Sequence, residues 1–237
     1  MKLLFIGNSY TFFNNLPATV CALSARDGEP WTAERYLRGG AGMRTHLCDN
    51  FGIAANRGPY CQELDPVRVG VLTRLLETKW DAVVLQGQSM DTVRTPDDFF
   101  AYGKALADLV RSSGSGRVLL YQTWARQHFP EMQCVITRHY DRLAAAAGCE
   151  VVRVGEAWAR VFAERPDFVL HTPDRSHPNP CGSYLAACMF YRALSGKPAA
   201  GLTHDLGHIT WSDKPDAARY DLDAPTAAFL QGVADSF

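Results

Sequence analysis

Residues 3–17 read LLFIGNSYTFFNNLP, and the stretch changes character at Gly7. Leu3 to Ile6 form a short apolar run of the kind that fills a buried strand. A glycine, an asparagine and a serine follow at once, where a simple connection would need only a turn. We therefore expect a strand whose carboxyl end presents Ser9 in a functional position.

Short apolar runs recur along the chain between longer amphipathic segments. Strands are expected at 3–6, 33–37, 82–85, 118–121 and 151–154, and helices at 16–26, 67–78, 97–112, 132–147, 156–164 and 180–194. The run 33–37 alternates with charged residues like an edge strand, whereas the others are nearly all apolar, as in parallel strands covered on both faces. Strand alternating with helix predicts an α/β fold with a parallel, right-handed, doubly wound sheet.

The length of 237 residues suits one domain that spans residues 1–237. Residues 47–66 contain glycines and prolines without any period, so they are interpreted as a long loop or cap. Residues 199–237 are interpreted as a C-terminal extension whose amphipathic stretch 224–233 packs on the domain.

Charge and cysteine content narrow the classes of partner and the compartment. The net charge is −1, with 24 basic and 25 acidic residues, so nucleic acid and anionic membranes are not expected partners. The seven cysteines are scattered without a CxxC pair, which favours reduced thiols in the cytoplasm. The apolar run at the start is too short for a signal peptide or a membrane span, so with a natural start at Met1 we expect a cytoplasmic protein.

Six residues suited to catalysis or ligand binding follow the predicted strand ends or precede the last long helix. They are Ser9, Gln86, Gln88, Trp124, Asp174 and His177. In open α/β sheets the functional crevice lies beyond the carboxyl ends of the strands, so these segments can converge on one rim.

The sequence Asp174-Arg175-Ser176-His177 is the most informative of these segments. A catalytic histidine needs a carboxylate that holds its tautomer, and it must in turn reach a hydroxyl group. Asp174 and His177 can touch on a bent loop, and Ser9 would supply the hydroxyl. The pattern predicts a Ser9-His177-Asp174 triad.

The same reaction requires donors for a developing oxyanion. The backbone N–H of Ser9, at the start of a helix, is one candidate. The loop Gly39-Gly40-Ala41-Gly42 can present another N–H group at close approach, and the carboxamide of Gln86 or Gln88 can be the third.

These motifs resemble those of the SGNH (GDSL-type) hydrolases. FIGNSYT resembles their first block with Gly7, Asn8 and the nucleophile Ser9, GGAG resembles their second block, and Asp174 with His177 resembles their fifth. The resemblance spans residues 3–194 and implies a flavodoxin-like three-layer α/β/α sandwich with a five-stranded parallel sheet. It also implies an oxyanion role for a glycine of the second block, for which Gly40 is favoured over Gly42.

The third block, LQGQS, departs from the usual Gly-x-Asn of the family. It is more similar to the Gln-Gly-Glu-Ser variant of the sialate and carbohydrate O-acetylesterase branch, and the whole set of motifs resembles a bacterial branch with a glutamine in this block. The resemblance implies Gln86 as the oxyanion donor, with Gln88 as the second choice. Asn8 is a candidate for steadying the nucleophile loop, and Trp124 for core packing or for a wall against a sugar or acyl group.

The predicted function is hydrolysis of a small acyl ester, with acetyl as the favoured acyl group and an acylated carbohydrate as one candidate substrate. No metal or organic cofactor is expected: His204 and His208 have helical spacing but no evident third ligand. The alternatives are a flavodoxin-like module that binds FMN and a catalytically silent sugar-binding relative. No oligomeric state is predicted.

Overall fold

A computed structural model describes residues 1–55, 63–206 and 222–237. Five strands in these ranges form one parallel sheet in the order β2-β1-β3-β4-β5. The strands are β1 (Lys2–Gly7), β2 (Thr32–Leu37), β3 (Ala82–Leu85), β4 (Arg117–Tyr121) and β5 (Glu150–Val152). The predicted α/β fold with a five-stranded parallel sheet is confirmed, and β2 is an edge strand as its charge pattern predicted.

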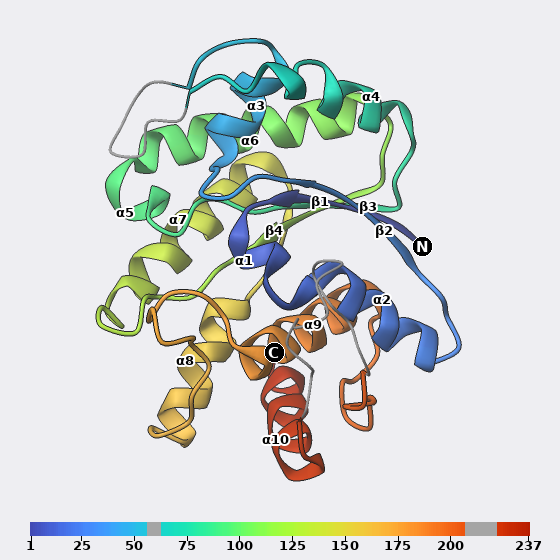
Figure 1. Cartoon of the computed structure of the whole chain (residues 1–237), viewed down its shortest axis with the longest axis vertical. Coiled ribbons are helices and arrows are strands. Elements are labelled where there is room, and N and C mark those ends of the chain that lie inside the picture. Colours follow the sequence, from blue (N-terminus) through green and yellow to red (C-terminus); the bar gives the residue numbers. More distant parts are fainter. Residues whose placement is uncertain (56–62, 207–221) are drawn as a thin grey trace.

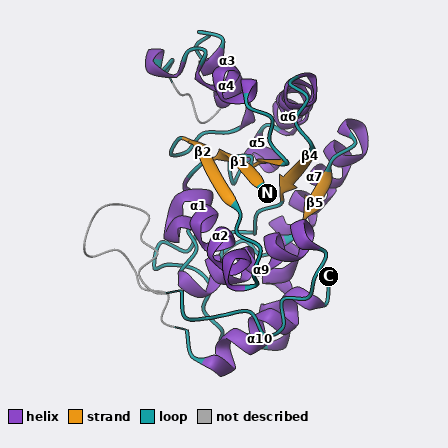
Figure 2. Ribbon diagram, turned by 90° about the vertical axis from the view of Figure 1, so that its right-hand side faces the viewer, coloured by secondary structure: helices purple, strands orange, loops and turns teal. Residues whose placement is uncertain are grey.

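Helices cover both faces of the sheet and complete three layers (Figures 1 and 2). One layer holds α3 (Met43–Asn50), α4 (Val71–Glu77), α5 (Asp91–Arg94), α6 (Pro96–Ser112) and α7 (Met132–Ala147). The other layer holds α1 (Ser9–Phe12), α2 (Leu16–Arg26), α8 (Val154–Glu164), α9 (Pro180–Ser195) and α10 (Ala224–Asp235). Figure 1 shows α3, α4 and α6 on one side of the strands and α2 and α9 on the other.

Side-chain alternation along the strands builds two cores. Leu3 and Phe5 of β1 face the layer of α2, α8 and α9, whereas Leu4 and Ile6 face the layer of α4, α6 and α7. Successive residues of a strand point to opposite faces, so an apolar run fills both cores at once. This explains why the central strands carry almost no polar residues.

Predicted element bounds agree with the structure where the period is long. The helices predicted at 16–26 and 132–147 have these bounds, and the predicted helix 180–194 is extended by one residue in α9. The single helix predicted at 67–78 is wrong, because Gly70 has a φ of 69° and separates the 3-10 turn η2 (Pro66–Arg68) from α4. A left-handed residue ends one helix and cannot continue it into the next.

The structure also corrects the predicted loop at 47–66. Residues 47–50 belong to α3, and residues 56–62 lie outside the described part of the chain, so a cap there stays a prediction. His208 also lies outside the described ranges. In the C-terminal extension, α10 contacts α8 and α9, and Arg192 of α9 pairs with Asp235 at 2.8 Å.

Three properties of residues 1–55, 63–206 and 222–237 bear on disulfides, metal sites and membrane spans. The six cysteines in these ranges are free thiols. No group of three or more His, Cys, Asp or Glu residues in the same ranges could hold a metal ion. None of their helices has the length and apolarity needed to cross a bilayer.

The contact between α8 and the end of β4 yields a stability prediction. A Cβ at Gly155 would lie 2.1 Å from the backbone oxygen of Thr123, which cannot move aside as a flexible side chain can. Gly155→Ala should therefore lower the free energy of unfolding by about 1–3 kcal/mol in urea titrations.

The matched control is Gly232→Ala in α10, where a Cβ meets nothing within 4 Å. This change should raise stability by about 0.5–1 kcal/mol, because alanine loses less backbone entropy in a helix. Equal effects of the two substitutions would contradict the close packing of α8 against the segment that follows β4.

Candidate active site

The site lies at the carboxyl ends of β1 and β3, where the strand order reverses. The chain leaves β1 toward β2 on one side, whereas β3 lies on the other side of β1. Such a switch point leaves a crevice at the strand ends. Asn8 caps α1 immediately after β1, and its side chain accepts a hydrogen bond from Tyr10 N–H at 3.1 Å, so Ser9 becomes the first residue of the helix.

A buried amide pair joins the two strand ends. Gln86 Oε1 accepts from Asn8 N–H at 2.9 Å, and Gln86 Nε2 donates to Asn8 Oδ1 at 2.8 Å. Asn8 Nδ2 donates to the carbonyl oxygens of Ala41 at 2.7 Å and of Gly87 at 3.2 Å. Both side chains are almost fully buried, so unpaired groups here would cost free energy, and the complete pairing defines one arrangement of the loops.

Position 7 must be a glycine because the side chains of Gln86 and Thr11 approach its backbone closely. A Cβ at Gly7 would lie 2.6 Å from Gln86 Oε1 and 2.6 Å from Thr11 Oγ1. Any side chain at this position would displace the glutamine that holds Asn8. This explains the glycine at the mouth of the first strand.

Hydrogen bonds shape the loop that precedes α9 into a tight turn. Thr172 N–H donates to His177 O at 2.8 Å, and Arg175 N–H donates to Thr172 O at 2.9 Å, with Arg175 at a φ of 60°. Asp174 Oδ1 accepts from the backbone N–H groups of Ser176 and His177, each at 2.9 Å. The carboxylate therefore organises the same loop that carries the histidine.

The fold brings Ser9, His177 and Asp174 together as the sequence predicted. His177 Nε2 lies 2.9 Å from Ser9 Oγ across 168 positions of sequence. His177 Nδ1 is hydrogen-bonded to Asp174 Oδ2. With the proton assigned to Nδ1, the ring donates to the carboxylate and accepts from the serine hydroxyl.

The environment keeps Asp174 ionised. Desolvation by burial raises the pKa of this carboxyl, but hydrogen bonds from the His177 ring and backbone, the Thr172 hydroxyl and Ser176 N–H outweigh it. The pKa of Asp174 consequently lies well below its usual range, since each of these donors favours the charged form. A carboxylate that stays charged at neutral pH can stabilise an imidazolium.

Aromatic contacts and a strained turn orient the histidine ring. Phe13 stacks on His177 with centroids 4.2 Å apart, and Tyr10 meets the ring edge to face at 5.5 Å. Asn14, at a φ of 50°, donates from Nδ2 to Pro178 O at 3.0 Å and to Ser183 Oγ at 2.9 Å. The segment after Ser9 is thereby tied to the loop of His177.

A hollow of about 220 Å³ opens above the serine and the histidine. Its lining comes from five segments of chain and consists of Asn8, Ser9, Tyr10, Gly40, Gln88, Ser89, Arg126, Ser176 and His177. Gly40 has a φ of 69°, a conformation that favours glycine. The predicted residues Gly40 and Gln88 therefore lie beside Ser9.

Asp174, which is hydrogen-bonded to the His177 ring, does not line this hollow, and neither do the predicted residues Gln86, Gly42 and Trp124. Both hydrogens of the Gln86 amide are donated inside the protein, to Asn8 Oδ1 and Gly87 O, so the geometry contradicts its role as a direct oxyanion donor. Gly42 is the N-cap of α3 and lies against the Asp91 carboxylate. Trp124 is buried, and its Nε1 donates to Ser176 O at 2.9 Å.

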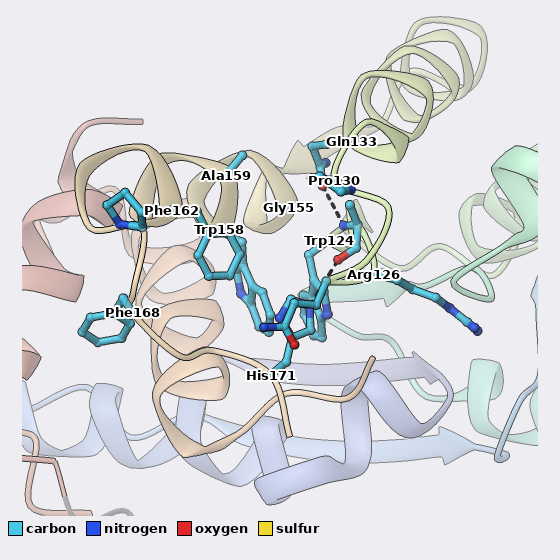
Figure 3. Close-up of a pocket in the computed structure, with 13 residues that line it drawn as sticks. Trp124, Arg126, Pro130, Gln133, Gly155, Trp158, Ala159, Phe162, Phe168 and His171 are labelled. Carbon is cyan, nitrogen blue, oxygen red and sulfur yellow. Dashed lines mark hydrogen bonds between the residues drawn. The ribbon is translucent and has the colours of Figure 1, made fainter. Parts of the chain in front are cut away.

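Trp124 instead borders a second cavity of about 410 Å³, shown in Figure 3. It stacks between Tyr10, at 4.6 Å, and Trp158, at 3.9 Å. The tryptophan thus supports the floor of the site and forms a wall of the neighbouring cavity.

Arg126 and Ser89 line the hollow although neither was a predicted site residue. Ser89 is the last residue of the third block, LQGQS, and its membership of that block was the only sequence signal for its place in the site. Arg126 follows β4 by five positions in a loop without a motif, so nothing local indicated its place.

No protein-family model and no curated protein matches this chain. Solved structures do match it. A DUF4886 family protein from Bacteroides uniformis is similar with a TM-score of 0.76 and 18% identity, over 100% of this chain and 93% of that one. A candidate SGNH hydrolase from Slackia heliotrinireducens is similar with a TM-score of 0.65 and 23% identity, over 82% and 98% of the two chains.

The psychrotrophic esterase EstA from a Pseudoalteromonas species is also similar, with a TM-score of 0.58, 11% identity, and coverage of 82% and 97%. The flavodoxin-like α/β/α architecture predicted from the sequence is thus confirmed. At sequence identities of 11–23%, the similarity to these structures is a similarity of fold.

Asp91 gives the site a testable dependence on pH. Burial raises the pKa of this carboxyl to about 7, the hydrogen bond from Gln88 N–H opposes the rise, and Asp98 adds to it. The folded protein then binds the proton more tightly than the unfolded chain, so stability falls as the pH rises from about 4 toward 7. Asp91→Asn should reduce the loss of unfolding free energy between pH 5 and pH 8 by on the order of 1–4 kcal/mol.

Urea titrations at the two pH values test this expectation, and Asp167→Asn, at an exposed loop position, is the matched control. The control should retain the pH dependence of the wild type. An unchanged pH dependence in Asp91→Asn would contradict a raised pKa at this carboxyl.

Proposed function

We propose that this protein is a serine esterase that removes a small acyl group, with acetyl as the favoured group and a carbohydrate hydroxyl as the favoured leaving alcohol. The observation that carries the proposal is the hydrogen-bond chain from Ser9 Oγ to His177 Nε2, at 2.9 Å, and from His177 Nδ1 to Asp174. A nucleophile, a base and an orienting carboxylate in this order are what acyl transfer requires.

In the first half of the proposed reaction, Ser9 Oγ attacks the ester carbonyl and passes its proton to His177 Nε2. Asp174 stabilises the resulting imidazolium. The tetrahedral intermediate collapses when the carbon–oxygen bond to the alcohol breaks and His177 protonates the departing alkoxide. An acyl-Ser9 ester remains.

In the second half, water takes the place of the alcohol. His177 removes a proton from the water as it attacks the acyl carbonyl, and the second tetrahedral intermediate then releases the carboxylic acid. His177 returns its proton to Ser9 Oγ, which restores the starting state. The proton transfers in both halves use Ser9, His177 and the attacking water, with Asp174 beside the ring.

Three donors are proposed for the oxyanion: Ser9 N–H, Gly40 N–H and the Gln88 amide. Within the described ranges, neither backbone N–H donates to another group of the protein. Gln88 Oε1 accepts from Met90 N–H at 2.6 Å, which orients the amide and leaves its Nε2 available. Donors arranged before the reaction stabilise the charge as it develops.

The dimensions and lining of the hollow support a small acyl group. Its volume of about 220 Å³ is below the roughly 300 Å³ at which pockets for drug-sized molecules begin. Hydroxyl, amide and guanidinium groups dominate its lining, and these groups suit a hydroxyl-rich alcohol. The esterase EstA and the lipolytic G-D-S-L family protein of Veillonella parvula, both similar in fold, support the same reaction type.

The substrate is proposed to be a small molecule, and neither nucleic acid nor membrane is a proposed partner. The cytoplasm is the proposed compartment, because free thiols persist where the surroundings are reducing.

Hydrolysis of p-nitrophenyl acetate tests the proposal directly. Ser9→Ala and His177→Ala should each lower kcat about 10⁴-fold or more, and Asp174→Asn about 10³- to 10⁴-fold. Ser112→Ala, on the far end of α6, should keep the wild-type rate. A fluorophosphonate probe should label the wild type and leave Ser9→Ala unlabelled.

Equal rates in the wild type and in Ser9→Ala would contradict the mechanism. A folded wild type that neither hydrolyses esters nor reacts with the probe, but binds sugars, would favour the silent sugar-binding alternative.

The two glutamines of the third block should have different effects when changed. Gln88→Ala should lower kcat for p-nitrophenyl acetate about 10²-fold with little change in unfolding free energy, because it removes an oxyanion donor. Gln86→Ala should lower the free energy of unfolding by about 1–3 kcal/mol, because it leaves Asn8 unpaired in a buried position. Loss of stability in Gln88→Ala, with unchanged kcat, would reverse the assignment.

A further inference from the structure

Arg126 places a cation at the edge of the proposed catalytic hollow. The residue follows β4 in a loop that contacts the loop of His177 at two points: Trp124 Nε1 donates to Ser176 O at 2.9 Å, and Gln127 N–H donates to Arg175 O at 3.1 Å. One bond is made by a residue that precedes Arg126 and the other by the residue that follows it, so the backbone at Arg126 is held from both directions along the chain. Its position beside the serine is therefore part of the folded architecture.

The guanidinium is directed toward the hollow. Arg126 lines both the hollow and the neighbouring 410 Å³ cavity. Figure 3 shows its side chain extending away from Trp158, Phe162 and Phe168, which line that cavity. Its Nη2 donates to Ser89 Oγ at 3.3 Å, and Ser89 lines the hollow with Ser9 and His177.

Arg126 is left with unused donors and no counter-charge. Its buried Nε has no hydrogen-bond partner, and among residues 1–55, 63–206 and 222–237 no carboxylate forms an ion pair with it. A guanidinium has five N–H donors in a planar fork, of which the protein uses one here. Buried polar groups are normally paired, so the unpaired buried Nε of this half-buried side chain, together with the Nη hydrogens that the protein does not use, favours a ligand in the hollow.

The surroundings leave the positive charge uncompensated. The other lining residues are neutral, apart from His177, which is the proposed base. The nearby carboxylate of Asp174 is engaged by His177, Thr172 and Ser176. The hollow therefore attracts a negative charge next to the nucleophile.

We propose that Arg126 binds a carboxylate of the substrate, so that the preferred ester of this protein is an anion with its carboxylate close to the scissile bond. The inference rests on the proposed esterase function and adds the class of substrate to it. A guanidinium matches a carboxylate through two parallel N–H to oxygen bonds, which fixes orientation as well as charge. Arg126 is thus a specificity-determining residue of the site.

The carboxylate can belong to the leaving alcohol or to the acyl group, and matched esters distinguish these sources. Acetylsalicylate carries a carboxylate on its leaving alcohol, and its methyl ester lacks that charge. Mono-p-nitrophenyl succinate carries a carboxylate on its acyl group, and p-nitrophenyl methyl succinate lacks that charge. Within each pair, the ratio of kcat/KM for the anionic over the neutral ester is measured in every variant, so that intrinsic reactivity cancels.

In at least one pair, Arg126→Gln should lower this ratio about 10- to 100-fold relative to the wild type, mainly through KM. Arg126→Lys should lower it less, about 3- to 10-fold, because the charge remains and the fork is lost. Arg138→Gln, an exposed position on α7, removes the same charge far from the hollow and should leave the ratio and the rates unchanged. Thermal unfolding of each variant confirms that it is folded.

An unchanged ratio in both pairs for folded Arg126→Gln and Arg126→Lys would overturn this inference while the proposed function stands. An equal loss on anionic and neutral esters would also overturn it and would assign Arg126 to the oxyanion. Absence of Ser9-dependent hydrolysis of every ester, neutral ones included, would overturn the proposed function and the inference with it.

Discussion

The buried hydrogen bonds between Asn8 and Gln86 hold together the two strand ends on which the site is built. β1 and β3 are neighbours in the sheet, but the chain departs from them in opposite directions, so nothing in the strands themselves defines the loops beyond. The amide pair closes this gap with reciprocal bonds of 2.8 and 2.9 Å, and Asn8 extends the network to the second-block loop through Ala41 O. Since neither side chain is accessible to water, breaking one bond leaves a buried group unpaired.

The hydroxyl and the imidazole depend on this network in different ways. Asn8 caps α1, and that cap determines where the helix begins and where the Ser9 side chain emerges. His177 is positioned from the opposite direction by a loop that Asp174 organises through the backbone of residues 176 and 177. One carboxylate therefore shapes the loop and polarises the ring, which links the local fold to the proposed chemistry.

The two glutamines of the third block differ in their surroundings: one is bonded within the protein and the other lines the hollow. Gln86 is structural, because both hydrogens of its amide are donated within the protein. Gln88 is turned toward the hollow, and its carbonyl oxygen is held by the backbone of Met90. Arg126 arrives from β4 and supplies charge to a site whose other lining groups are almost all neutral. The proposed nucleophile, the proposed oxyanion donors and the positive charge thus come from separate strand ends, as is typical of open α/β sheets.

Sequence by itself determined the layered fold and the identity of the candidate triad. Apolar runs between amphipathic segments specify parallel strands covered on both faces, because hydrophobic burial depends on period, and period is a local property. The contact between Asp174 and His177 could also be predicted, because two residues three positions apart on a bent loop can bring their side chains within hydrogen-bond distance. The short helices α1, α3 and α5 and the break at Gly70 were not, because four to eight residues are too few to show a period and one glycine can interrupt it. Only the tertiary structure decided which glutamine faces the hollow and that Arg126 joins it, since hydrogen-bond partners 78 positions apart and a loop after another strand leave no local trace.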